Sequence, residues 1–175
     1  VCHIALHDEP YPYILPLNFG LEVDGETVRL YFHGANTGTK YDLIAKNPNV
    51  AFEMDRGHAL ILDDEHGNCT MTYKSVIGQG RISVVPDADK ERALRVLMAQ
   101  YRAPDFPYSK AVIPATTVLC LTVEHMTGKQ AIELARIYRS GQDDALFWTK
   151  YIQNIMTPED RKNYEAHKSG TLKLQ

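Results

Sequence analysis

The chain has 175 residues, of which 44% are hydrophobic and 23% charged, and its formal net charge at pH 7 is −3. This length is typical of one globular domain, and the composition excludes the disordered and collagen-like classes. The small negative charge and the lack of a basic stripe argue against a nucleic-acid-binding protein. No apolar run reaches the roughly 20 residues that a membrane-spanning helix needs.

The cysteines indicate a reducing environment. Cys2, Cys69 and Cys120 form an odd set without C-x-x-C spacing, unlike the even, dense sets of secreted disulfide frameworks. The opening Val-Cys-His-Ile-Ala-Leu has the pattern of a strand rather than of a signal peptide. We therefore expect a cytoplasmic protein, and we expect further residues before Val1 because the sequence does not start with methionine.

Strand patterns begin at the N-terminus. Val1–His7 is short and apolar, and Tyr11–Phe19 is extended, with two prolines that place it at a sheet edge or a bulge. Asp24-Gly25 is a hairpin dipeptide, and it predicts a turn that joins residues 17–23 to Thr27–Phe32.

Further strands are predicted along the chain. Val50–Met54 is apolar, and Thr116–Val123 is apolar and rich in β-branched residues. Tyr73–Val85 is a long strand whose two glycines indicate a bulge or a tight bend. A separate segment, His58–Leu62, follows Val50–Met54 and precedes Tyr73–Val85. Several short strands with turns between them are typical of a barrel or a sandwich.

Three helical regions interrupt the strands. Tyr41–Lys46 predicts a short helix with Thr39 as its N-cap, and Asp87–Arg102 has apolar residues at the helical period. After Gly128 the sequence predicts helix to the C-terminus. We interpret residues 1–130 as one domain and residues 131–175 as a helical extension packed on it.

The loop before the first predicted helix has the parts of a phosphate site. A strand ends, a glycine-containing loop turns, and a helix begins, so that backbone N–H groups and the positive helix end point to one spot. Gly34 and Gly38 leave room for an anion, Thr39 offers a hydroxyl, and Lys40 a positive charge. His33, directly before the loop, could hydrogen-bond a cofactor or a substrate oxygen. An ordinary polar loop is the alternative, and the spacing fits neither a Walker A loop nor a dinucleotide fingerprint.

The other histidines do not predict a metal site. His3 and His7 share one face of a strand at a separation of about 13 Å, which is too far for one metal ion. His58, His66 and Cys69 lie near acidic residues but have no recognised ligand spacing. We therefore predict no bound metal.

Five segments together resemble the 5-nitroimidazole resistance (Nim) proteins of the pyridoxamine 5′-phosphate oxidase-like, flavin-binding split-barrel family. The resemblance spans roughly residues 1–130. It is carried by Pro12-Tyr13 with Pro16-Leu17-Asn18-Phe19, by Tyr31-Phe32-His33-Gly34-Ala35 with Gly38 and Lys40, by Asn47-Pro48 with Val50, Phe52, Glu53 and Asp55, by Tyr73 with Ser75-Val76-Ile77-Gly78 and Gly80, and by Met126-Thr127-Gly128-Lys129.

The resemblance implies a mainly β fold, a six-stranded Greek-key split barrel with flanking helices. It also implies a homodimer with one flavin in each of two clefts at the subunit interface, FMN in most members and FAD in some. The flavin phosphate would lie against Gly34, Ala35, Gly38, Thr39 and Lys40. The flavin ring and ribityl chain would lie along Pro16, Leu17 and Asn18 and along Ser75, Val76 and Ile77, with His33 beside the ring as the catalytic residue.

The activity implied by the resemblance is that of a flavin-dependent oxidoreductase, which passes electrons from reduced flavin to a small acceptor such as a nitroaromatic. Two alternatives stay open. One is a flavin carrier or sensor without turnover, and the other is a split barrel that binds haem through a histidine.

Overall fold

The computed structural model describes residues 1–63, 68–109 and 111–131. These residues form one antiparallel sheet of seven strands in the order β2-β1-β5-β6-β7-β4-β3. The strands are β1 (Cys2–Leu6), β2 (Tyr13–Leu17), β3 (Gly20–Asp24), β4 (Thr27–Ala35), β5 (Asn49–Asp63), β6 (Asn68–Val84) and β7 (Thr116–Ala131). The helices are α1 (Thr39–Lys46), α2 (Lys90–Gln100), which follows a short 3-10 turn at Asp87–Asp89, and α3 (Val112–Ala115).

The connection between β2 and β3 shows that the sheet curls into a barrel. These two strands are at opposite edges of the sheet, yet only Asn18 and Phe19 separate them in sequence. Three Cα–Cα steps span at most about 11 Å, so the two edges must approach each other. The split-barrel prediction is confirmed, with seven strands in the described residues instead of the expected six. The strand count differs because the extended segment is interrupted at Asn18-Phe19. β2 before this point lies at one edge of the sheet, and β3 after it lies at the other.

The barrel core follows from alternation along the strands. Cys2, Ile4 and Leu6 of β1 face inward, while the residues between them are partly exposed. Phe19, Phe32 and Phe52 fill the interior together with Val76, and α1 closes one end with Leu43 and Ile44. A second, smaller cluster lies under α2, where Ala93 and Leu94 pack against Tyr31 of β4 and Val118 of β7.

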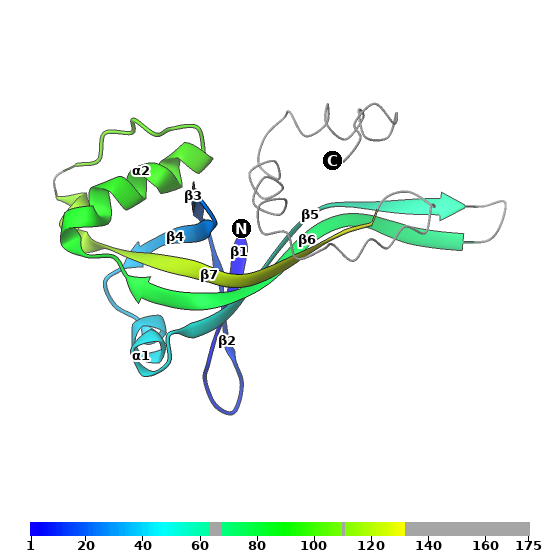
Figure 1. Cartoon of the computed structure of the whole chain (residues 1–175), viewed down its shortest axis with the longest axis horizontal. Coiled ribbons are helices and arrows are strands. Elements are labelled where there is room, and N and C mark those ends of the chain that lie inside the picture. The colour runs from blue at the N-terminus through cyan, green and yellow to red at the C-terminus, as the bar shows by residue number, and fades with distance from the viewer. Residues whose placement is uncertain (64–67, 110, 132–175) are drawn as a thin grey trace.

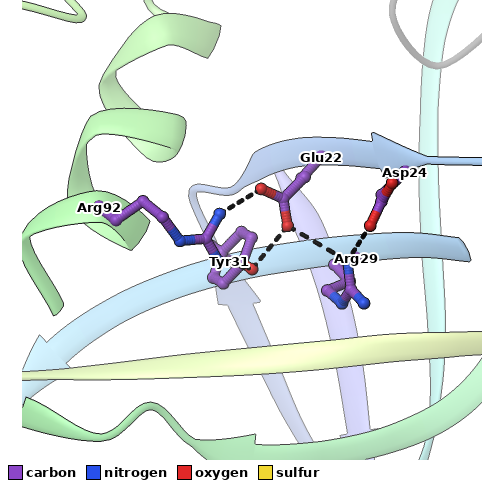
Figure 2. A network of polar contacts seen from close by, with 5 residues as sticks. All are labelled: Glu22, Asp24, Arg29, Tyr31 and Arg92. Carbon is purple, nitrogen blue, oxygen red and sulfur yellow. Dashed lines mark hydrogen bonds and ion pairs between the residues drawn. The ribbon is translucent and has the colours of Figure 1, made fainter. Parts of the chain in front are cut away.

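A polar network fixes α2 to the β3–β4 hairpin (Figure 2). Tyr31 donates a 2.8 Å hydrogen bond to Glu22, and Arg92 of α2 donates a 2.9 Å bond to the Tyr31 hydroxyl and a second bond to Glu22. Arg29 lies 3.4 Å from the same carboxylate. Burial and the bond to Glu22 raise the pKa of Tyr31 to about 12, so this phenol stays protonated and can donate.

The β5–β6 hairpin and the start of β7 were predicted only in part. Val50–Met54 and His58–Leu62 belong to one strand, β5, whose register shifts between Arg56 and Ala59, where Gly57 has a positive φ of 71°. In Figure 1, β5 and β6 extend far beyond the barrel. The predicted bend of β6 corresponds to a register irregularity against β7 between Gln79 and Gly80.

Two helix predictions were wrong in detail. Thr39 is the first residue of α1 and not its N-cap; the N-cap is Gly38, whose φ of 130° suits glycine. The chain after Gly128 continues as strand to Ala131, because Gly128 pairs with Val76 and Lys129 with Ser75 of β6. The rest of the predicted helical extension, residues 132–175, lies outside the described residues.

Among the described helices, none is long and apolar enough to cross a membrane.

Candidate functional site

The loop between β4 and α1 holds a lysine over a glycine-rich backbone. The Lys40 ammonium donates a 3.5 Å hydrogen bond to the Thr37 carbonyl. It also lies 4.3 Å from the centre of the Tyr41 ring. No side chain caps the first turn of α1. The Tyr41 N–H of that turn donates to the Gly38 carbonyl at 3.1 Å, and the N–H groups of Thr39 and Lys40, ahead of it in the same turn, are the ones that an anion would use.

The two glycines leave space directly beside this ammonium. A Cβ placed on Gly34 would lie 3.7 Å from Lys40 Nζ, and one placed on Gly38 would lie 3.5 Å from it. A phosphate oxygen in that space would be within reach of a charged hydrogen bond from Lys40. The charge and the hydrogen-bond donors of these residues are compatible with a phosphate group, and phosphate binding stays a prediction.

Neighbouring elements hold the loop in place. The Tyr41 hydroxyl donates a 2.5 Å hydrogen bond to the Ala35 carbonyl. The Asn36 amide donates to the Pro114 carbonyl at 3.3 Å, and its oxygen accepts a 2.9 Å bond from Thr117 of β7. The loop is thus tied to α1, to α3 and to the central sheet, which reduces the entropy that ligand binding must remove.

His33 lies at the end of β4, immediately before this loop. Its side chain is exposed, and its cross-strand partner on β7 is the fully buried Val118. The imidazole is therefore accessible to a small molecule beside the loop that precedes α1.

A second group of predicted residues lies on the outer face of the sheet, away from the core. The strand register places Pro16, His3, Glu53, Ile77 and Thr127 in one cross-strand row over β2, β1, β5, β6 and β7. We call these five residues the outer row. It brings Pro16 and Ile77, which are 61 positions apart in the sequence (77 minus 16), onto one surface.

Beside the outer row lies Asp55, which pairs with Ser75 on β6. His3 Nδ1 is 3.2 Å from the Glu53 carboxylate, and His58 Nε2 is 2.8 Å from the Asp55 carboxylate. Glu53 and Asp55 belong to the motif that carried the family resemblance, but their pairing with histidines was not predicted from the sequence. The i, i+2 spacing of the two acids indicated a shared face; only the register of β1 on β5 shows that His3 joins them.

The predicted site residues therefore fall mainly into two groups. Residues 33–40 run from the end of β4 through the loop into the first turn of α1. Pro16, Ser75 and Ile77 lie on the outer face of the sheet, and Asn18 lies in the connection between β2 and β3. The Val76 side chain is completely buried in the barrel core and Leu17 packs against that core, so these two could reach a ligand only through their backbone. α1 packs against β1, the strand that carries His3 of the outer row.

The curled antiparallel sheet, with the lysine-bearing glycine loop between β4 and α1, defines a split-barrel protein. The chain belongs to the pyridoxamine 5′-phosphate oxidase family, whose model matches residues 1–130. A search among curated proteins returned no match.

Solved structures agree with this assignment. The chain is 30% identical to a putative 5-nitroimidazole antibiotic resistance protein from Bacteroides thetaiotaomicron, with a TM-score of 0.63 over 73% of this chain and 74% of that one. It is 17% identical to an FAD and haem binding protein from Mycobacterium smegmatis, with a TM-score of 0.61 over 84% and 71% of the two chains. It is 19% identical to the flavocytochrome Anf3 from Azotobacter vinelandii, with a TM-score of 0.58 over 75% of this chain and 61% of that one. The last two similarities show the fold alone.

Proposed function

We propose that this protein is an FMN-binding oxidoreductase that passes electrons from reduced flavin to a small acceptor such as a nitroaromatic. The observation that carries the proposal is the Lys40 ammonium beside the Gly34 and Gly38 backbone, at the start of α1 that no side chain caps. Membership of the pyridoxamine 5′-phosphate oxidase family and the 30% identity to the nitroimidazole resistance protein support the choice of a flavin.

The residues of this chain have separate tasks in the proposal. Lys40 and the first-turn N–H groups of α1 bind the phosphate, with Thr39, Gly34 and Ala35 beside them. Residues 16–18 and 75–77 follow the flavin ring and the ribityl chain. His33 holds the acceptor or transfers a proton to it. The flavin itself supplies the one- and two-electron chemistry, and the protein orients the acceptor against it.

We further propose a homodimer in which the outer face of the sheet forms the interface and completes the flavin cleft. Ile14 and Ile77 on this face are 60% and 57% exposed, and Pro16, two residues after Ile14 on β2, is exposed on the same face. Exposed apolar residues gathered on one face are typical of a protein interface. A cytoplasmic location is part of the same proposal.

The first experiment is the absorption spectrum of the freshly purified protein, followed by heat release and identification of the chromophore. Flavin bands with FMN in the released fraction are the expected result. FAD would keep the phosphate site but change the cofactor, and a Soret band would favour the haem alternative. A colourless protein that does not bind added FMN would contradict the proposal.

A second experiment separates the enzyme from a flavin carrier. The bound flavin is reduced anaerobically with dithionite, the excess reductant is removed, and a nitroaromatic is added. We expect the bound flavin to reoxidise faster than free reduced FMN at the same concentration, with loss of the nitro absorbance. Reoxidation no faster than that of free FMN would favour the carrier. Bleaching by NADH or NADPH would then identify the electron donor.

A further inference from the structure

The strongest feature outside the flavin proposal is a cluster of three metal-ligating side chains on the outer face of the sheet. His3 of β1 lies directly opposite Glu53 of β5, and Asp55 follows two residues later on the same face. One ligand atom from each residue lies within 4.8 Å of the other two. Because hydrogen-bonded strands hold all three backbones, the cluster is largely preorganised.

The distances suit a single ion. Imidazole nitrogens and carboxylate oxygens bind Zn²⁺ at roughly 2.0–2.2 Å, so ligand atoms around one ion lie roughly 3–4.2 Å apart. The His3–Glu53 separation of 3.2 Å is already in this range, and a small rotation of the Asp55 side chain brings the third atom into it. Two carboxylates and a neutral imidazole carry a charge of −2, which a divalent cation neutralises.

A fourth residue supports the cluster from outside. His58 Nε2 lies 2.8 Å from an Asp55 oxygen, and its position results from the register shift between Arg56 and Ala59. Histidine–carboxylate pairs of this kind orient the ligands of metal sites. The side chains of His3, Glu53 and Asp55 are 44%, 39% and 32% exposed in the single chain. Because the outer face is also the proposed dimer interface, a bound ion would lie at that interface.

We propose that His3, Glu53 and Asp55 bind one divalent transition-metal ion of the zinc type, with His58 positioning Asp55. The competing explanation is a pair of surface ion pairs, His3–Glu53 and His58–Asp55, in which both rings are protonated. Exposed pairs of this kind contribute little to stability. His3, Glu53 and Asp55 are the cross-strand partners of Pro16, Ile77 and Ser75, along which the flavin ring is proposed to lie. The metal site therefore has to be tested with and without bound flavin.

The test is isothermal titration of Zn²⁺ into the full chain prepared without a histidine tag. We expect one Zn²⁺ per chain. Glu53→Gln keeps the size and polarity of the side chain but removes its charge, and it should weaken binding by at least the roughly 10–100-fold that loss of an outer ligand partner costs. Glu26→Gln, in the exposed turn between β3 and β4, is the matched control and should bind as the unmodified chain does.

Two further measurements make the result decisive. His3→Gln should weaken binding as Glu53→Gln does, with unchanged circular dichroism because the side chain is partly exposed. X-ray absorption at the zinc edge should show nitrogen and oxygen ligands. Sulfur ligands, or loss of binding in Cys69→Ser, would assign the ion to the exposed thiol instead and overturn the proposal.

The titration is carried out on flavin-loaded and flavin-free protein. One-site binding in either form that Glu53→Gln abolishes supports the metal site. No binding in both forms, or equal binding by Glu53→Gln and Glu26→Gln, refutes it. The flavin absorbance of the same samples reports the flavin proposal separately, so the two can fail independently.

Discussion

Replacing Lys40 with alanine tests the phosphate site most directly. The ammonium borders the space that Gly34 and Gly38 leave open, at 3.7 Å and 3.5 Å from the Cβ positions there. A phosphate oxygen in that space would accept a charged hydrogen bond, which contributes about 1.5–3 kcal/mol. The dissociation constant of FMN should therefore increase about 10- to 150-fold in Lys40→Ala.

The same substitution should hardly affect folding. Within the described residues, the contacts recorded for the Lys40 ammonium are the 3.5 Å bond to the Thr37 carbonyl and the Tyr41 ring. A cation over an exposed ring contributes about 0.5–1 kcal/mol, so the loss of stability should stay below about 1.5 kcal/mol. Weaker FMN binding could not then be attributed to an unfolded protein.

The assay is a fluorescence titration of flavin-free protein with FMN, combined with urea unfolding of each variant. Lys46→Ala is the matched control, since Lys46 is an exposed lysine in the last turn of the same helix. It lies six residues, or about 9 Å along the helix axis, from Lys40, which is about one Debye length at physiological ionic strength. An unchanged FMN affinity in Lys40→Ala, or an equal loss in Lys46→Ala, would refute the phosphate site.

Three other predictions follow from the structure. His33→Ala should retain flavin but slow reoxidation by a nitroaromatic, and unaltered rates in the anaerobic assay would remove His33 from the mechanism. Gly20→Ala should cost about 1–3 kcal/mol or more in urea unfolding, because its Cβ would lie 2.3 Å from Leu97 Cα; adding Leu97→Ala should not restore stability, since the overlap is with backbone. Burial alone would raise the pKa of Glu22, but the hydrogen bonds from Tyr31 and Arg92 outweigh it, so the pKa is lowered. The Glu22 carboxylate therefore contributes to stability above about pH 4.5. This contribution should be lost as the pH falls through the folded-state pKa. Between about pH 7 and pH 3, Glu22→Gln should therefore lose less stability than the unmodified chain does, and parallel pH curves would contradict this.

Much of the local structure was predictable because its causes are local. The period-2 alternation of Cys2, Ile4 and Leu6 is enough to predict a strand with one buried face. The Asp24-Gly25 hairpin was confirmed, with Gly25 and Glu26 as the two turn residues between the paired Asp24 and Thr27. The strand–loop–helix pattern around Gly34 and Lys40 was correct as well, since each of its parts depends on neighbours in the sequence.

The errors occurred where distant strand pairing or the backbone conformation of a turn decides the structure. Gly128 and Lys129 precede a helical pattern, but their hydrogen bonds to β6 keep them in strand. Thr39 is a good N-cap residue by its chemistry, yet Gly38 can adopt the positive φ at which the chain turns into α1. In both cases a long-range or backbone constraint outweighed the intrinsic preference of the residue.

Local sequence patterns are enough to predict most of the strands, the turn at Asp24-Gly25 and the composition of the loop that we assign to phosphate. The placement of β2 and β3 at opposite sheet edges, and of His3 beside Glu53, 50 residues further along the chain, depends on the tertiary fold. Alternation within a strand determines which side chains share a face, but not which strand lies next to it. That choice depends on burying the apolar faces of all seven strands in one core, and no local pattern records it.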